Sequence, residues 1–238
     1  MIRKAGFIAF YIVLFCITIA VCQQAVTVIQ VKMHSRTSNK GKYTQQKADI
    51  WYQQKDGKMV SHFDSPEMLI MTNSKGEATL YDFVQNKVAV RQDGAYSTEA
   101  SYFYFFLSSK INDLGLKDMG FSLNDTKFAD RRVITTWTPP PALKSILLRV
   151  ELVLEDYKPI YMAYYSVKNK VIRKVYYYKY QTFGNQVTLP LNVTEINYLD
   201  DGDSALTKTT YSDVLINEQV TDMRFLNFKI PADAKKMD

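Results

Sequence analysis

The sequence predicts a mainly β protein built on one strongly curved antiparallel sheet, either a closed barrel or an open half-barrel. Short runs that alternate apolar and polar residues recur along the chain, and turn signals such as Asp56-Gly57 separate them. The 17 Tyr and 13 Phe residues support the same prediction, because aromatic side chains favour strands. The runs number roughly a dozen, and that many strands form one sheet only when the sheet curls.

The first 22 residues predict a signal peptide that is cleaved on export. Arg3 and Lys4 give a short positive start, and residues 5–21 then carry no charge. Ala20-Val21-Cys22 ends this run with small residues at the positions that a signal peptidase reads. The predicted cut therefore lies before Gln23.

Two other interpretations of this segment stay open. Ile19-Ala20-Val21-Cys22 partly fits a lipobox, in which Cys22 would carry a lipid anchor, although Val21 stands where Gly, Ala or Ser is preferred. The apolar run could also be a retained membrane anchor, because it reaches the short end of the roughly 17–25 residues that a spanning helix needs. If the cut is made, Cys16 and Cys22 are both lost, and residues 23–238 form a single domain without disulfides or thiolate chemistry.

Six strands are expected in the first half of the exported chain. Gly57 and Gly76 lie in two of the turns between them, because Gly readily adopts the positive φ that tight hairpin turns require. The expected strands are 26–33, Tyr43–Gln54, Lys58–Asp64, Met68–Thr72, Glu77–Val84 and Lys87–Gln92.

One helix is expected to interrupt the strands near residues 97–110. Ser97 is suited to cap it, and Glu99 lies in its first turn, where the helix dipole favours an acid. Tyr102 to Leu107 are six apolar residues in succession, so such a helix is buried on both sides or covers an apolar cavity. A buried strand is the competing interpretation of this run.

The second half is predicted to return to strands after a loop over residues 111–130. Within the aromatic run, Tyr176, Tyr178 and Tyr180 would share one face of a strand. We interpret them as a cross-strand aromatic ladder, with ligand stacking as the alternative. The expected strands are Arg131–Thr138, Ser145–Asp156, Ile160–Val167, Val171–Gln181, Val187–Asp200, Ser204–Ile216 and Phe225–Ile230.

The sequence nominates no catalytic or cofactor site. It contains no G-x-S-x-G elbow, P-loop, dinucleotide fingerprint or H-E-x-x-H motif. The two histidines, His34 and His62, have no third metal donor at suitable spacing. The net charge of +6 is scattered, and its densest cluster, residues 168–174, surrounds a predicted turn, which argues against nucleic-acid binding. We therefore expect no enzymatic activity, metal or cofactor, with a hydrolase of unrecognised site as the enzymatic alternative.

Two stretches of the chain carry a family resemblance. Residues 64–88, DSPEMLIMTNSKGEATLYDFVQNKV, contain a Pro, an apolar strand, a Gly turn and a strand that ends in Tyr-Asp. Near the end, Tyr211–Val214, Val220–Asp222 and Phe225–Pro231 follow one another as three short segments. Both stretches resemble the outer-membrane lipoprotein carrier (LolA) and lipoprotein-sorting family, in order and spacing over most of the exported chain.

The resemblance implies an open half-barrel whose concave apolar face is covered by one or more helices. A protein of this kind is a periplasmic carrier that shields the acyl chains of a lipoprotein or other lipid during transfer to the outer membrane. It would be a monomer with transfer partners at the inner and outer membranes. The residues expected to line the cavity and its lid are Leu69, Met71, Leu80, Tyr81, Phe103, Phe106, Leu107 and Met162.

Two departures from the family pattern leave an alternative function open. Carriers commonly have Arg immediately before the proline of the first stretch, where it helps hold the lid, and this chain has Ser65. Residues 26–36 resemble a strand rather than the amphipathic helix of carriers. The alternative is an interaction or sensor module of the cell envelope, in which side chains of the protein itself would fill the cavity.

Overall fold

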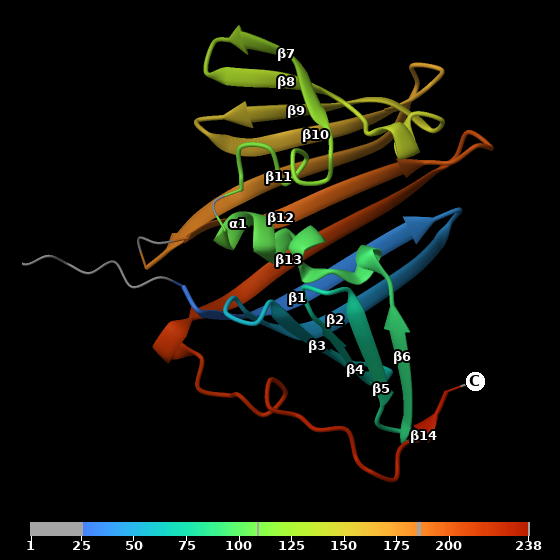
Figure 1. Ribbon diagram of the computed structural model, residues 1–238, viewed down its shortest axis with the longest axis vertical. Coiled ribbons are helices and arrows are strands. Elements are labelled where there is room, and N and C mark those ends of the chain that lie inside the picture. The colour runs from blue at the N-terminus through green and yellow to red at the C-terminus, as the bar shows by residue number, and fades with distance from the viewer. Residues whose placement is uncertain (1–25, 109, 185–186, 238) are drawn as a thin grey trace, which may run out of the picture.

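The computed structural model describes residues 26–108, 110–184 and 187–237, so the predicted signal peptide of residues 1–22 lies outside the described residues. Within them, fourteen strands form a single sheet in the order β14-β6-β5-β4-β3-β2-β1-β13-β12-β11-β10-β9-β8-β7 (Figure 1). No helix among these residues has the length and apolarity that a membrane crossing requires.

The strands divide into two runs on either side of the helix. The first run is β1 (Val28–Asn39), β2 (Lys42–Gln53), β3 (Lys58–Asp64), β4 (Glu67–Thr72), β5 (Glu77–Asp82) and β6 (Lys87–Gln92). The second is β7 (Ser122–Ala129), β8 (Arg132–Thr138), β9 (Leu147–Glu155), β10 (Lys158–Ser166), β11 (Val171–Phe183), β12 (Val187–Tyr198), β13 (Ser204–Ile216) and β14 (Lys235–Lys236).

The sheet is curved and does not close. Neighbouring strands are antiparallel except for β14, which runs parallel to β6. β7 and β14 occupy the two ends of the sheet and lie on opposite sides of the molecule (Figure 1). These observations confirm the predicted mainly β fold and show that it is an open half-barrel rather than a closed barrel.

The predicted helix is present but shorter than expected. Helix α1 spans Tyr102–Leu107, and its N-cap is Ser101, whose Oγ accepts a hydrogen bond of 3.2 Å from the amide of Tyr104. Ser97 instead caps a separate 3₁₀ turn, Thr98–Ala100. The strand interpretation of the Tyr102–Leu107 run is therefore wrong. Other 3₁₀ turns are Gly94–Tyr96, Pro141–Leu143 and Asn217–Gln219.

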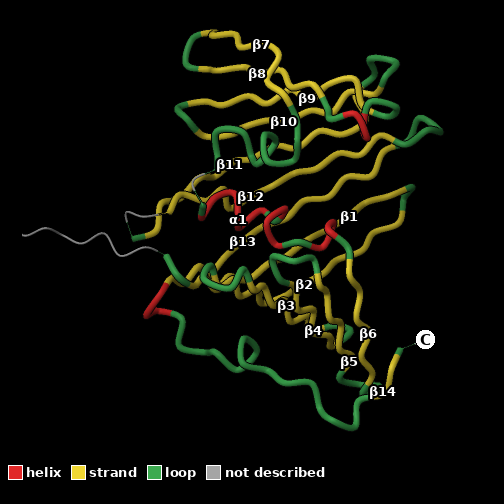
Figure 2. Tube along the Cα trace, in the orientation of Figure 1, coloured by secondary structure: helices red, strands yellow, loops and turns green. Residues whose placement is uncertain are grey.

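Two hydrophobic cores lie on opposite faces of the sheet, which we call the inner and outer faces. Strand β2 shows the division, because successive side chains of a strand point to opposite faces. Ile50 and Tyr52 belong to the first core, with α1 on the inner face, and Trp51 belongs to the second. The second core is covered by residues 217–234, an irregular segment that crosses the outer face before β14 (Figure 2).

Two sequence predictions about secondary structure are wrong. Residues 111–130 were expected to be a loop, but β7 occupies their second half as an exposed edge strand. Phe225–Ile230 was expected to be a strand, but it belongs to the irregular segment over the outer face. Phe225, Leu226 and Phe228 all pack on the second core, and three such close neighbours cannot share one face of a strand.

The aromatic run of β11 is also arranged differently from the prediction. Lys179 has a positive φ of 56°, and this local irregularity breaks the alternation of faces. Tyr177 and Tyr180 consequently both reach Phe106 of α1, each with a ring-centroid distance of 6.3 Å. Tyr176 instead packs against Tyr161 of β10, at 5.1 Å. The tyrosines of this run therefore place side chains on both faces of the sheet.

Candidate functional site

A cavity of about 380 Å³ lies between α1 and the inner face of β10–β13. Its size falls within the roughly 300–1,000 Å³ that is typical of small-ligand pockets. Aromatic and aliphatic side chains make up most of its wall. The lining residues are Tyr102, Phe105, Phe106, Leu114, Met119, Met162, Tyr164, Arg173, Val175, Tyr177, Val193, Glu195, Thr209 and Tyr211.

Helix α1 forms the roof of this cavity and is attached to the sheet through aromatic contacts. The ring of Tyr102 stacks on that of Tyr211 in β13, and the hydroxyl of Tyr102 donates to the carbonyl oxygen of Pro190 in β12. Phe103 meets Tyr211 edge-on, with centroids 5.5 Å apart. The side chains of α1 are apolar on every side of the helix. One side packs on the sheet, and the other side is covered by another part of the chain.

The segment that follows α1 provides this outer cover. Lys110 donates to the hydroxyl of Tyr104 at 2.8 Å and pairs with Asp118. Gly115 has a φ of +74°, and a Cβ at this position would lie 2.3 Å from the ring of Phe105. Gly is therefore needed here both for the backbone conformation and for the close approach to the helix.

The end of the cavity that lies away from α1 is polar. Arg173 of β11 donates to Glu195 of β12 at 2.8 Å, and Asn197 donates to the other carboxylate oxygen at 2.6 Å. Burial opposes the charge of Arg173, but the Glu195 carboxylate outweighs it and raises the pKa of the guanidinium. The Nε of Arg173 is buried and has no hydrogen-bond partner. The guanidinium lies 5.3 Å from the ring centre of Tyr164, and its positive charge is located at this end of the cavity.

Hydroxyl groups extend this polar region along the inner face. Ser35 of β1 and Thr209 of β13 share a hydrogen bond of 3.2 Å, and Thr37 and Thr207 share one of 2.9 Å. The inner face thus changes from aromatic beneath α1 to polar toward the β1–β2 turn. A surface with these two parts suits an amphipathic molecule, because each part of the molecule meets a matching environment.

The tyrosines of the cavity are neutral over the ordinary pH range. Burial raises the pKa of Tyr177 and that of Tyr211 above the usual value for tyrosine. Their hydroxyls therefore remain hydrogen-bond donors in the wall of the cavity. Within the described part of the chain, no group of three or more His, Cys, Asp or Glu residues could hold a metal ion.

Half of the residues predicted to form the site lie at the cavity or in its roof. Phe106 and Met162 line it. Phe103 is buried on α1 in the first core, and Leu107 packs against that core. Leu80 of β5 lies opposite Ile70 of β4 and is half-buried.

The other three predicted residues lie on the outer face of the sheet. Leu69 and Tyr81 are buried in the second core, and Met71 packs against it. The register explains this position, because Leu69 is opposite His62, whose ring stacks on Phe225 of the covering segment at 4.0 Å. The structure therefore does not bring these residues together with Phe106 and Met162.

Sequence reasoning missed the polar end of the cavity. Arg173 was grouped with a basic cluster around a turn, but it lies within β11 and shares a face with Val175 and Tyr177. Its alternation with these two residues was the available signal. The partnership with Glu195 depends on the pairing of β11 with β12, which the sequence alone does not specify.

The fold of this protein is an open antiparallel half-barrel in which a short helix covers a cavity with aromatic walls. No family model matches the chain, and no curated protein sequence matches it. Among solved structures, a DUF1329 family protein from Desulfovibrio piger is similar with a TM-score of 0.59 and 13% identity, covering 85% of this chain and 91% of the other.

Two further solved structures with a similar fold are a lipoprotein-sorting protein domain and a LolA superfamily protein. An outer membrane lipoprotein-sorting protein domain from Vibrio parahaemolyticus has a TM-score of 0.56 and 12% identity, over 83% of this chain and 88% of its own. A LolA superfamily protein from Nitrosomonas europaea has a TM-score of 0.53 and 12% identity, over 80% and 86%. The chain therefore has a LolA-like fold, which confirms the resemblance seen in the sequence at the level of fold.

Proposed function

We propose that this chain is a non-enzymatic binding protein that shields the acyl part of a lipid or lipoprotein in the cavity beneath α1. The observation that carries the proposal is the hollow of about 380 Å³ with aromatic and aliphatic walls and a polar end. Side chains of the protein itself would fill this space in a module that binds only a protein partner. The open hollow therefore favours the carrier over the sensor alternative.

The physical need for such a cavity follows from the hydrophobic effect. Each methylene group hidden from water contributes about 0.8 kcal/mol, so an acylated molecule cannot leave a membrane unaided at a useful rate. A lid held by side-chain contacts rather than by covalent bonds allows both uptake and release. Met162 and Met119 in the wall adapt to chains of different shape, because methionine is unbranched and flexible.

The proposal extends to the cellular setting. The signal-peptide pattern of residues 1–22 and the LolA-like fold together support a periplasmic carrier that acts as a monomer and exchanges cargo with membrane partners. The proposed role in transfer to the outer membrane is supported by the similar fold of the outer membrane lipoprotein-sorting protein domain from Vibrio parahaemolyticus.

Lipid extraction tests the proposal directly. The protein, expressed from its complete sequence and purified without detergent, is extracted with organic solvent for mass spectrometry and titrated with a fluorescent fatty acid. We expect a co-purifying lipid and saturable uptake of the probe. Val193→Trp fills the cavity and should abolish both results, whereas Val90→Trp, at an exposed strand position, should change neither. Absence of lipid and of uptake in the unaltered protein would contradict the carrier function.

A further inference from the structure

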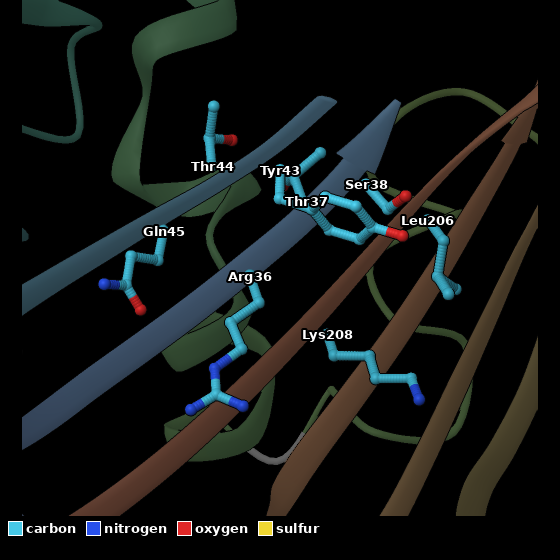
Figure 3. Close-up of a pocket in the computed structure, with 8 residues that line it drawn as sticks. All are labelled: Arg36, Thr37, Ser38, Tyr43, Thr44, Gln45, Leu206 and Lys208. Atoms are coloured by element: carbon cyan, nitrogen blue, oxygen red, sulfur yellow. The ribbon is translucent and has the colours of Figure 1, made fainter. Parts of the chain in front are cut away.

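A second hollow, of about 580 Å³, lies at the far end of β1, β2 and β13 (Figure 3). Strand alternation places its charged side chains on the outer face, away from the cavity beneath α1. Val28 of β1 packs on the second core of the outer face, and Arg36 has the same parity along the strand. The lining residues are Arg36, Thr37, Ser38, Tyr43, Thr44, Gln45, Leu206 and Lys208.

Two positively charged residues lie side by side at this hollow. Arg36 of β1 and Lys208 of β13 are direct cross-strand partners, so their Cβ atoms are about 4.5–5.5 Å apart. Like charges in this arrangement destabilise a sheet. Both residues are exposed, and they extend toward the same side of the strands in Figure 3. The charges of this pair are therefore unfavourable for the sheet by itself.

No carboxylate neutralises this pair within the described residues. The ion pairs of the neighbouring strands involve other cations, such as Lys32 with Asp213. Asp201, in the adjacent β12–β13 turn, is bound by Lys40. The Nε of Arg36 donates to the ring nitrogen of His34 at 3.4 Å, and the two terminal nitrogens of its guanidinium carry no ion pair to a carboxylate of the described residues.

Uncharged groups complete the hollow around the two cations. Gln45 is the cross-strand partner of Arg36 on β2 and adds an amide donor. Ser38 adds a hydroxyl, and the ring of Tyr43 points across it toward Leu206 (Figure 3). The result is a concave site in which two cations and neutral donors border a largely apolar wall.

We propose that this hollow binds a phosphate group, carried either by a soluble molecule or by a lipid headgroup. The planar guanidinium of Arg36 can form two parallel hydrogen bonds to phosphate oxygens, and the ammonium of Lys208 acts as a point charge beside it. Bound phosphate converts the repulsion between the two cations into attraction to a shared anion. The site lies on the opposite face from the lipid cavity, so it does not depend on the proposed carrier function.

Thermal unfolding of the full chain in phosphate and in chloride at equal ionic strength tests the proposal, because equal ionic strength removes the general effect of screening. We expect phosphate to raise the Tm more than chloride does. In the double variant Arg36→Gln/Lys208→Gln, apparent phosphate affinity should fall by about tenfold or more. This variant should also be more heat-stable than the unaltered protein at low salt, since the repulsion is gone.

Lys55→Gln is a control for the general effect of charge, because it removes an exposed charge in the turn between β2 and β3, away from the hollow. It should keep the phosphate response. Sedimentation with vesicles of phosphatidylglycerol or phosphatidylcholine distinguishes the two sources of phosphate. Binding to phosphatidylglycerol that the double variant loses identifies a lipid headgroup, and a phosphate effect without vesicle binding identifies a soluble ligand. Equal responses to phosphate and chloride, or an unchanged response in the double variant, would overturn the proposal.

Discussion

The ring of Tyr102 on α1 lies nearly parallel to that of Tyr211 on β13, with centroids 4.9 Å apart and planes inclined by 17°. The hydroxyl of Tyr102 donates to the carbonyl oxygen of Pro190 on β12. One side chain thus connects the helix to two neighbouring strands. A helix of six residues has little stability of its own, so the closed position of α1 depends on contacts of this kind.

Substitution of Tyr102 is expected to loosen the lid. Tyr102→Ala removes both the stack and the hydrogen bond, so a bound fluorescent fatty acid should dissociate much faster. Tyr102→Phe keeps the stack and loses a hydrogen bond of about 1 kcal/mol, which corresponds to dissociation about fivefold faster. Stopped-flow release into excess unlabelled fatty acid measures both rates. An unchanged rate in Tyr102→Ala would show that α1 does not gate the cavity.

Arg173 is expected to select ligands by their headgroup. Arg173 lines the cavity, and its cationic guanidinium could attract a ligand carboxylate. Arg173→Met should therefore weaken binding of laurate by about tenfold, the equivalent of about 1.4 kcal/mol, and leave binding of lauryl alcohol nearly unchanged. Displacement of a fluorescent probe by each ligand provides the comparison. Equal losses for both ligands would indicate a structural role for Arg173 instead.

Alkaline pH is expected to destabilise the protein through its buried tyrosines. Burial raises the pKa of Tyr52 from 10.0 to about 12, so the hydroxyl ionises in the unfolded chain before it ionises in the folded protein. Stability should be constant below pH 10 and should fall between pH 10 and 12. Each such tyrosine adds about 1.4 kcal/mol per pH unit to the slope.

Urea unfolding at several pH values from 9 to 11 measures this slope. Tyr52→Phe removes one titrating group, so its stability should fall less steeply with pH than that of the unaltered protein. Equal slopes in the two proteins would show that Tyr52 does not contribute to alkaline unfolding.

Local patterns in the sequence were sufficient to predict most of the sheet. From β2 to β6 and from β8 to β13, the predicted ranges agree with the structure to within two residues, because alternation and Gly-containing turns define these strands locally. β7 was missed since all of its residues are exposed, so it has no buried face to produce an alternating pattern. Asn124-Asp125, which resembles a turn, lies at an irregularity in its pairing with β8.

The candidate site was less predictable, because its residues depend on which segment of the chain covers each face of the sheet. Phe106 and Met162 could be found from apolarity alone. Leu69 is equally apolar, but the segment around Phe225 covers its face of the sheet, and that segment is distant in sequence. Ser65, which stands where carriers commonly have Arg, lies exposed in the β3–β4 turn. Its position therefore gave no information about the lid.

The covering segment on the outer face leads to a final prediction, which separates stability from binding. Leu226 is 2% exposed and packs with Trp51, whose indole nitrogen donates to the carbonyl oxygen of Asp222 at 2.9 Å. Leu226→Ala should cost about 2–5 kcal/mol of unfolding free energy, measured by urea titration with tryptophan fluorescence. Val84→Ala, at a position 79% exposed, should cost less than about 0.5 kcal/mol.

Binding should respond differently from stability. Because the second core lies on the opposite face from the cavity, fatty-acid affinity of the folded Leu226→Ala protein should stay within about twofold of the unaltered value, less than 0.5 kcal/mol. A large loss of affinity would mean that the two faces are energetically coupled, and a small loss of stability would mean that the segment covers the sheet without supporting it.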